Sequence, residues 1–98
     1  MQIQIQRRAE IALRSLQKPE RKQIERALHE LLASERADLK LSPKFSLLAA
    51  GPSGKKIAIY KGGPKFRLVL SFQDEICTLE DIVDHDRLNR LVKHEGQE

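Results

Sequence analysis

The stretch KKIAIYKGGPKFRLVLSFQDEICTLEDIVD, residues 55–84, contains three apolar runs separated by two turn signals. The runs at 56–60, 66–72 and 76–83 have the length and the residue types of β-strands. Gly-Gly-Pro at 62–64 and the polar residues at 73–75 stand where hairpin turns would join these runs. The stretch therefore predicts an antiparallel meander of three strands.

The sequence before the meander predicts a short strand followed by two helices. In MQIQIQ, Ile3 and Ile5 alternate with glutamines, which is the period of a half-buried strand. A first helical stripe stops before Pro19, and Pro19 can occupy the first turn of a second helix. The first stripe consists of Ala9, Ala12, Leu13 and Leu16, and the second of Ile24, Ala27, Leu28, Leu31 and Leu32. The two stripes predict a helical hairpin.

Two further segments flank the predicted strands. Residues 35–54 have an irregular pattern with several Pro and Gly breakers, so the apolar patch Phe45, Leu47 and Leu48 is expected to cover the core. After the meander, Asp84 is a suitable N-cap for a last short helix through His94. Leu88, Leu91 and Val92 would face inward from that helix.

The predicted order β-α-α-β-β-β-α indicates an α+β fold with the helices packed on one face of the sheet. The opposite face would be left open. A chain of 98 residues is near the modal size of one domain, so a single domain over residues 1–95 is expected. Residues 96–98 are expected to form a disordered tail.

Positive charge is concentrated in the middle third of the sequence. Residues 39–73 contain seven bases and no acid, whereas the rest of the chain contains eleven bases and fourteen acids. Such segregation indicates a surface for a polyanion such as nucleic acid. A solvated basic face, or a docking surface for an acidic protein, explains the same composition equally well.

The sequence also indicates the cellular compartment in which the protein is expected. It contains neither a signal peptide pattern nor an apolar run of the roughly 18 residues that a membrane helix needs. Cys77 is the only cysteine, so an internal disulfide is excluded, and its expected role is a buried strand residue. A cytoplasmic protein without a membrane partner is therefore expected.

Side-chain alternation predicts which residues share a face of the first hairpin. Phe66, Leu68, Leu70 and Phe72 form the apolar side of one strand, so Arg67 points to the other. If Ile57 and Ile59 belong to the apolar side, then Lys56, Ala58 and Tyr60 join Arg67 on the open face, and Lys61 and Lys65 flank the turn. We expect a basic floor suited to phosphate.

The motifs KKIAIY, FRLVL and LEDIVDHDRLNRL resemble the RelE/ParE superfamily of bacterial toxins from type II toxin–antitoxin systems. The resemblance covers nearly the whole chain. It implies a toxin that a cognate antitoxin neutralises. In the RelE-like branch, it also implies an endoribonuclease (an mRNA interferase) that inhibits translation by cutting mRNA in the ribosomal A site. That reaction uses no metal or other cofactor: the ribose 2′-hydroxyl attacks the adjacent phosphorus, cations stabilise the phosphorane, and an acid protonates the leaving 5′-oxygen.

The resemblance assigns four catalytic positions. Arg67 would clamp the scissile phosphate, Lys56 would act as base or phosphate ligand, His85 would transfer a proton, and Arg87 would reach the same phosphate. The substrate-binding positions would be Lys55, Tyr60, Lys61 and Lys65.

Roles without catalysis also remain open for two of the catalytic candidates. Arg67 could be an exposed strand arginine paired with a carboxylate, and His85 could be a solvated or helix-capping residue. The sequence also departs from RelE-like members, because Ala58 replaces a lysine and the last helix lacks their tyrosine. A ParE-like inhibitor of DNA gyrase and a catalytically inert binding protein are therefore the alternatives.

Overall fold

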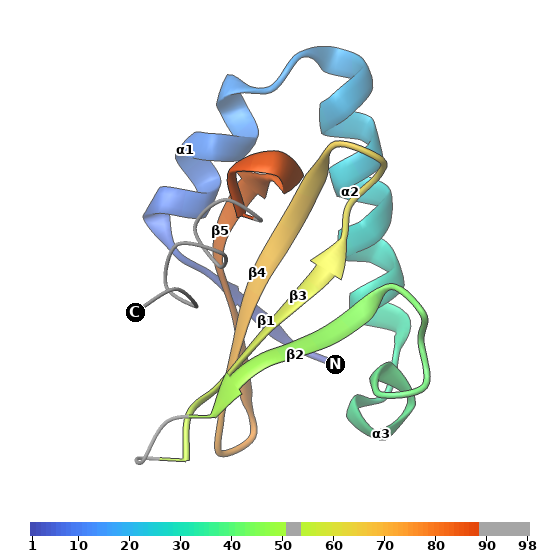
Figure 1. The fold of residues 1–98 in the computed structure, drawn as a ribbon, viewed down its shortest axis with the longest axis vertical. Coiled ribbons are helices and arrows are strands. Elements are labelled where there is room, and N and C mark those ends of the chain that lie inside the picture. Colours follow the sequence, from blue (N-terminus) through green and yellow to red (C-terminus); the bar gives the residue numbers. More distant parts are fainter. Residues whose placement is uncertain (51–53, 89–98) are drawn as a thin grey trace.

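The computed structural model of the chain is described here over residues 1–50 and 54–88. The described part has an α+β fold, with the helices and the sheet arranged as in Figure 1. In chain order the elements are β1 (Ile3–Ile5), α1 (Arg7–Ser15), α2 (Lys18–Ala33), α3 (Arg36–Leu39), β2 (Phe45–Ala50), β3 (Lys56–Lys61), β4 (Phe66–Gln73) and β5 (Ile76–Asp84).

The strands form one five-stranded sheet in the order β1-β5-β4-β3-β2. The predicted meander is present as β3, β4 and β5, and β2 pairs antiparallel with β3 on its outer side. β1 pairs parallel with β5, with Ile3 opposite Cys77 and Ile5 opposite Leu79. The predicted fold class and the short N-terminal strand are therefore confirmed.

α1 and α2 are the predicted helical hairpin. Figure 1 shows them running in opposite directions along the sheet, joined by a short connection. Pro19 lies in the first turn of α2, where its missing N–H breaks no helical hydrogen bond. The apolar stripe of α2 is buried at Ile24, Ala27 and Leu31. None of the helices in the described residues is long and apolar enough to cross a membrane.

The segment 35–54 is more regular than its sequence indicates. It contains the short helix α3 and the edge strand β2, and Leu47 and Leu48 of β2 are exposed instead of covering the core. Leu39 of α3 and Phe45 of β2 do pack against the core. A bulge between Leu47 and Ala49 shifts the register of β2, so the strand lacks the simple alternation that reveals most half-buried strands.

The register between β3 and β4 decides which residues lie on which face of the sheet. Tyr60 is opposite Leu68, and Ala58 is opposite Leu70. Directly opposed residues project to the same face, so Ala58 and Tyr60 lie on the face that the helices cover. Both are buried in the core with Leu68 and Leu70. The prediction that β3 directs Ile57 and Ile59 to the covered face is therefore wrong, whereas the outward side of Arg67 in β4 is confirmed.

The last predicted helix begins where the sequence places it. Residues 85–88 are helical, and Asp84 Oδ1 accepts hydrogen bonds from the N–H groups of Asp86 (2.8 Å) and Arg87 (3.4 Å). Asp84 is therefore the N-cap that the sequence predicts. The predicted positions of Leu91 and Val92, the end of the helix and the tail at 96–98 lie outside the described residues.

Cys77 is buried on the helix-covered face, as the sequence predicts. Burial raises the pKa of its thiol to about 11 from an ordinary value of 9.0. The folded chain therefore holds the proton at pH values where the unfolded chain releases it. Between these two values the unfolded chain binds fewer protons, so the free energy of unfolding falls as pH rises.

We expect the free energy of unfolding to fall by roughly 2 kcal/mol between pH 9 and pH 11 because of Cys77 alone. Urea denaturation of the chain and of Cys77→Ala across this range measures the difference. The two curves should run parallel below pH 9 and converge above it. Parallel curves throughout would contradict a protonated thiol in the folded state.

The β3–β4 turn lies against α2, and its glycine Gly63 faces the flexible end of the exposed Gln23 side chain. Gly63 has a φ of +112°, and a Cβ added there would lie 2.6 Å from Oε1 of Gln23. Gly54 also has a positive φ, of +84°, but an added Cβ would meet nothing within 4 Å. A comparison of substitutions at the two glycines therefore separates the cost of an unfavourable φ from the cost of a close contact.

Gly63→Ala is expected to lower the free energy of unfolding by about 1–3 kcal/mol, mainly because of the unfavourable φ, with a smaller cost for moving the end of the Gln23 side chain. Gly54→Ala carries only the φ cost and should be the milder variant. Urea denaturation of both variants checks the order, and equal losses would show that the contact with α2 contributes nothing.

Candidate functional site

The seven bases of residues 39–73 lie in different surroundings. Lys44 Nζ lies 2.9 Å from Oε2 of Glu30, and Lys65 Nζ lies 3.6 Å from Oε2 of Glu20. Both acids belong to α2. The hydrogen bond to Glu30 raises the pKa of Lys44 above its ordinary value. α2 thus neutralises two of the cations that the sequence presents as an unbroken basic segment.

Lys61 and Arg67 form the centre of the candidate site on the face of the sheet opposite α1 and α2. They lie directly opposite each other across β3 and β4 and therefore project to the same face. The Arg67 side chain is half-buried, and its Nη1 donates hydrogen bonds to the carbonyl oxygens of Gly63 and Phe66, both at 2.9 Å. Among residues 1–50 and 54–88, no carboxylate forms an ion pair with Arg67. The alternative role of Arg67, an ion pair with a carboxylate, is therefore not found among these residues.

His85 and Arg87 follow the strand that lies beside Arg67. Val83 is the partner of Arg67 in β5, and His85 comes two residues later. The His85 N–H donates to the Lys65 carbonyl oxygen at 2.7 Å, which ties the start of the last helix to the β3–β4 turn. Arg87 is exposed. The structure thus brings Lys61, Arg67, His85 and the turn residue Lys65 to one end of the sheet.

Tyr60 is not a surface residue. It is only 4% exposed, on the helix-covered face, and its hydroxyl lies 3.3 Å from Oε1 of Glu30. Burial raises the pKa of this phenol above its ordinary value. The prediction that Tyr60 lines the open face is therefore wrong, because the register of β3 directs it toward α2.

Lys56 and Lys55 are also separated from Arg67. Lys56 lies opposite Phe72, on the helix-covered side of the sheet. Lys55 lies at the other end of β3 from Lys61 and lines a shallow groove with Ser71, Thr78 and Glu80. The prediction that Lys56 and Arg67 stand side by side on one basic floor is therefore wrong.

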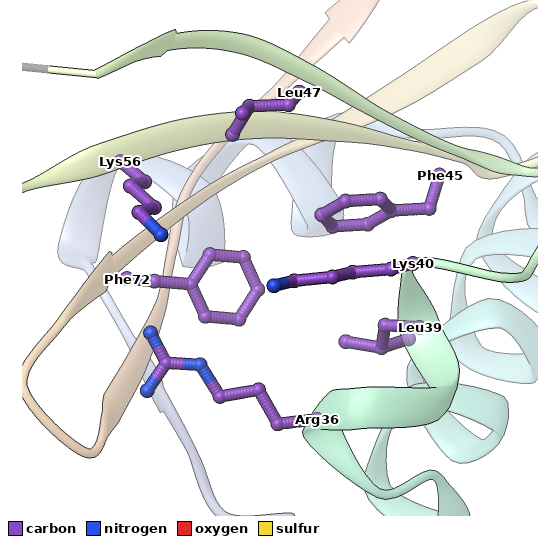
Figure 2. Close-up of a pocket in the computed structure, with 7 residues that line it drawn as sticks. All are labelled: Arg36, Leu39, Lys40, Phe45, Leu47, Lys56 and Phe72. Carbon is purple, nitrogen blue, oxygen red and sulfur yellow. The ribbon is translucent and has the colours of Figure 1, made fainter.

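Lys56 instead lines a pocket that the sequence analysis missed. This pocket has a volume of about 590 Å³ and opens between α3 and the strands β2, β3 and β4 (Figure 2). The lining residues are Arg36, Leu39, Lys40, Phe45, Leu47, Lys56 and Phe72. They come from four separate elements, so no local sequence motif joins them. The one local pattern that points to this pocket is a pair of cations four residues apart, Arg36 and Lys40, next to the apolar Leu39.

Solved structures establish the kind of fold. The chain is similar to the archaeal RelE–RelB complex of Pyrococcus horikoshii (TM-score 0.66, 17% identity, 88% of this chain and 96% of that chain). It is also similar to YafQ from Escherichia coli (TM-score 0.58, 15% identity, 89% and 96%). A third match is the E. coli DinJ–YafQ toxin–antitoxin complex (TM-score 0.51, 14% identity, 89% and 94%). The chain therefore has the RelE-like fold.

The sequence itself is far from that of known relatives. No protein-family model matches the chain, and no curated protein sequence matches it. Within residues 1–50 and 54–88, no group of three or more His, Cys, Asp and Glu side chains is arranged to hold a metal ion. The residues that the structure brings together at this end of the sheet are the cations Lys61, Lys65 and Arg67 and the imidazole of His85.

Proposed function

We propose that this protein is the toxin of a toxin–antitoxin system and acts as a ribosome-dependent, metal-independent endoribonuclease. The observation that carries the proposal is the pairing of Lys61 with Arg67 on the open face of a RelE-like sheet, without a carboxylate partner among the described residues. His85 lies two residues after Val83, the strand partner of Arg67, and adds an imidazole that can accept or donate a proton. Ribosomal mRNA as substrate would place the activity in the cytoplasm.

Each group has a defined task in this mechanism. The ribose 2′-oxygen forms a bond to phosphorus as the bond to the 5′-oxygen breaks, which leaves a 2′,3′-cyclic phosphate and a 5′-hydroxyl. Arg67 and Lys61 offset the charge that develops on the phosphorane oxygens. His85 takes the proton from the 2′-hydroxyl, a solvent water protonates the leaving 5′-oxygen, and Arg87 offers a further cation. Lys56 has no part in this site, since it lies on the other face.

One observation favours the alternatives, a ParE-like gyrase inhibitor or an inert binding protein. Arg67 already donates to two backbone carbonyls of its own turn, so part of its hydrogen-bonding capacity stabilises the hairpin. A guanidinium has five N–H donors, and these two bonds both use Nη1. The other nitrogens stay available to a phosphate. We therefore retain the ribonuclease as the first proposal.

The decisive experiment incubates the purified protein with a defined message, with and without programmed ribosomes, and maps the 5′ ends by primer extension. New ends within the translated region that require ribosomes support the proposal. A parallel assay of gyrase supercoiling tests the alternative. Supercoiling inhibition with an intact message would assign the ParE-like role, and inactivity in both assays would assign the inert role.

The antitoxin part of the proposal has its own test. Induced expression of the chain alone should stop growth, and co-expression of a small acidic protein encoded beside its gene should restore it. Such an acidic partner would fold as it binds to the basic residues of the segment 39–73. Harmless expression, together with no acidic neighbour, would overturn this part of the proposal.

A further inference from the structure

The pocket beside α3 combines an apolar floor with a rim of cations. Phe45, Phe72 and Leu39 pack in or against the core, and the two aromatic rings meet edge to face with centroids 6.1 Å apart. In Figure 2 the side chains of Arg36, Lys40 and Lys56 all extend toward the Phe72 ring from different sides. Among the residues that the structure describes, none that lines the pocket is acidic.

The three rim cations differ in how firmly they are held. Arg36 Cζ lies 5.2 Å from the centroid of Phe72, and Nη1 of Arg36 donates to the Asp74 carbonyl oxygen. Arg36 is therefore fixed at the mouth of the pocket. Lys40 and Lys56 have no ion pair with any described acid. Two ammonium groups next to an apolar floor offer favourable sites for carboxylates.

The surface beside the pocket extends this amphipathic character. β2 is an edge strand of the sheet, so one side of its backbone is unpaired by other strands. Leu41, Leu47 and Leu48 are large apolar side chains that remain exposed on β2 or just before it. An extended peptide lying along this edge would find backbone partners, apolar contacts and cations together.

We propose that this pocket, together with the edge of β2, docks an acidic peptide segment of a partner protein. One large apolar side chain of the peptide would enter between Leu39, Leu47 and the aromatic rings. Its flanking carboxylates would meet Lys40, Lys56 and Arg36. The site is on the opposite side of the sheet from Arg67 and Lys61, so the partner could be held without occupying the catalytic face.

A peptide fits this pocket better than a nucleic acid does. Phe72 is 5% exposed and Phe45 is half-buried, so neither ring offers an open face on which a base could stack. Backbone groups along an edge strand are matched by another peptide backbone. The three cations alone would suit phosphates, but the apolar floor requires an apolar side chain.

This docking site deepens the antitoxin part of the proposed function, on which the identity of the partner rests. The pocket's preference for acidic, apolar peptides does not depend on ribonuclease activity. Peptide binding by a chain that cleaves no message would leave the docking site standing and overturn the catalytic proposal. Cleavage by a chain that binds no such peptide would do the reverse.

The test titrates the full ¹⁵N-labelled chain with the peptide acetyl-EDLFED-amide and follows backbone amide shifts by NMR. We expect saturable shifts at Arg36, Lys40, Leu47, Lys56 and Phe72, with few changes around Arg67. The double variant Lys40→Glu and Lys56→Glu should bind at least about tenfold more weakly. The matched variant Lys18→Glu and Lys22→Glu makes the same charge change at exposed positions of α2 and should bind within about twofold of the wild type.

Two further peptides separate the contribution of the apolar side chains from that of the carboxylates. The peptide acetyl-EDGSED-amide lacks the apolar anchor, and acetyl-KKLFKK-amide reverses the charge, so both should bind more weakly. Absence of pocket shifts at about 1 mM peptide would overturn the proposal. Equal weakening in the two double variants would also overturn it, since the effect would then come from net charge. Stronger binding of hexauridylate at the same amides would reassign the pocket to nucleic acid.

Discussion

Arg67→Ala is expected to lower the rate of ribosome-dependent mRNA cleavage about 100- to 1,000-fold, since one charge-stabilising group at the phosphorane is worth that factor. Growth inhibition on expression should be lost with it. Primer extension on a translated message measures the rate. Arg67→Lys keeps one charge but not the bidentate geometry, so it should recover only part of the activity.

Lys56→Ala is the matched control for this prediction. It removes a strand cation from the same hairpin but on the other face, so cleavage should stay near the wild-type rate. Thermal denaturation of both variants shows whether the fold is kept. A Lys56→Ala variant as inactive as Arg67→Ala would show that the site is assembled differently from the arrangement described here. An active Arg67→Ala variant would remove the catalytic proposal.

Leu68→Ala is expected to cost about 2–5 kcal/mol of folding free energy, because it opens a cavity in the centre of the core. Leu68 is fully buried and lies between Tyr60 of β3 and Ile82 of β5. Small domains are stable by only about 5–15 kcal/mol, so the variant would be close to unfolding at elevated temperature. Urea denaturation at 25 °C measures the loss.

Leu41→Ala is the control for the same chemical change at a surface position. Leu41 is 82% exposed, and its truncation should change the free energy of unfolding by less than about 0.5 kcal/mol. A similar loss in both variants would mean that Leu41 packs against something in solution. A loss below about 1 kcal/mol for Leu68→Ala would contradict its place in the core.

The fold was predictable where the periodicity was clear. The helical stripes of α1 and α2, the strands β4 and β5 and the capping residue Asp84 all have one strong signal each, and the structure confirms them. β2 was not predictable in this way. Its sequence FSLLAA contains a bulge and is exposed along almost its whole length, so no face is marked by alternation.

The arrangement of the candidate site depended on one register. In KIAIYK both parities contain apolar residues, and the sequence favours the two isoleucines, Ile57 and Ile59, over Ala58 and Tyr60 as the core side. The turn at 62–65 sets Lys61 opposite Arg67, and this pairing assigns Ala58 and Tyr60 to the core instead. A shift of one residue exchanges the two faces of a strand. The sequence therefore predicted the face of the sheet on which Arg67 lies and placed Lys56 on the wrong face.

The structure gives Lys61 a more central place in the candidate site than the sequence does. In the sequence it stands at a turn, where a lysine is usually only solvated. The structure shows it as the direct cross-strand neighbour of Arg67. No property of the residue itself reveals this, because the pairing is a consequence of the length of the glycine-rich turn.

The parallel pairing of β1 with β5 joins the first strand to be synthesised with the last. The Met1 amino group also donates to the Leu32 carbonyl oxygen at 2.7 Å, so the beginning of the chain is held at the far end of α2. The strand β1 can pair only after β5 has been synthesised. Contacts between such distant segments slow folding. A newly made chain would thus pass through a stage in which the edge of β5 still lacks its partner strand.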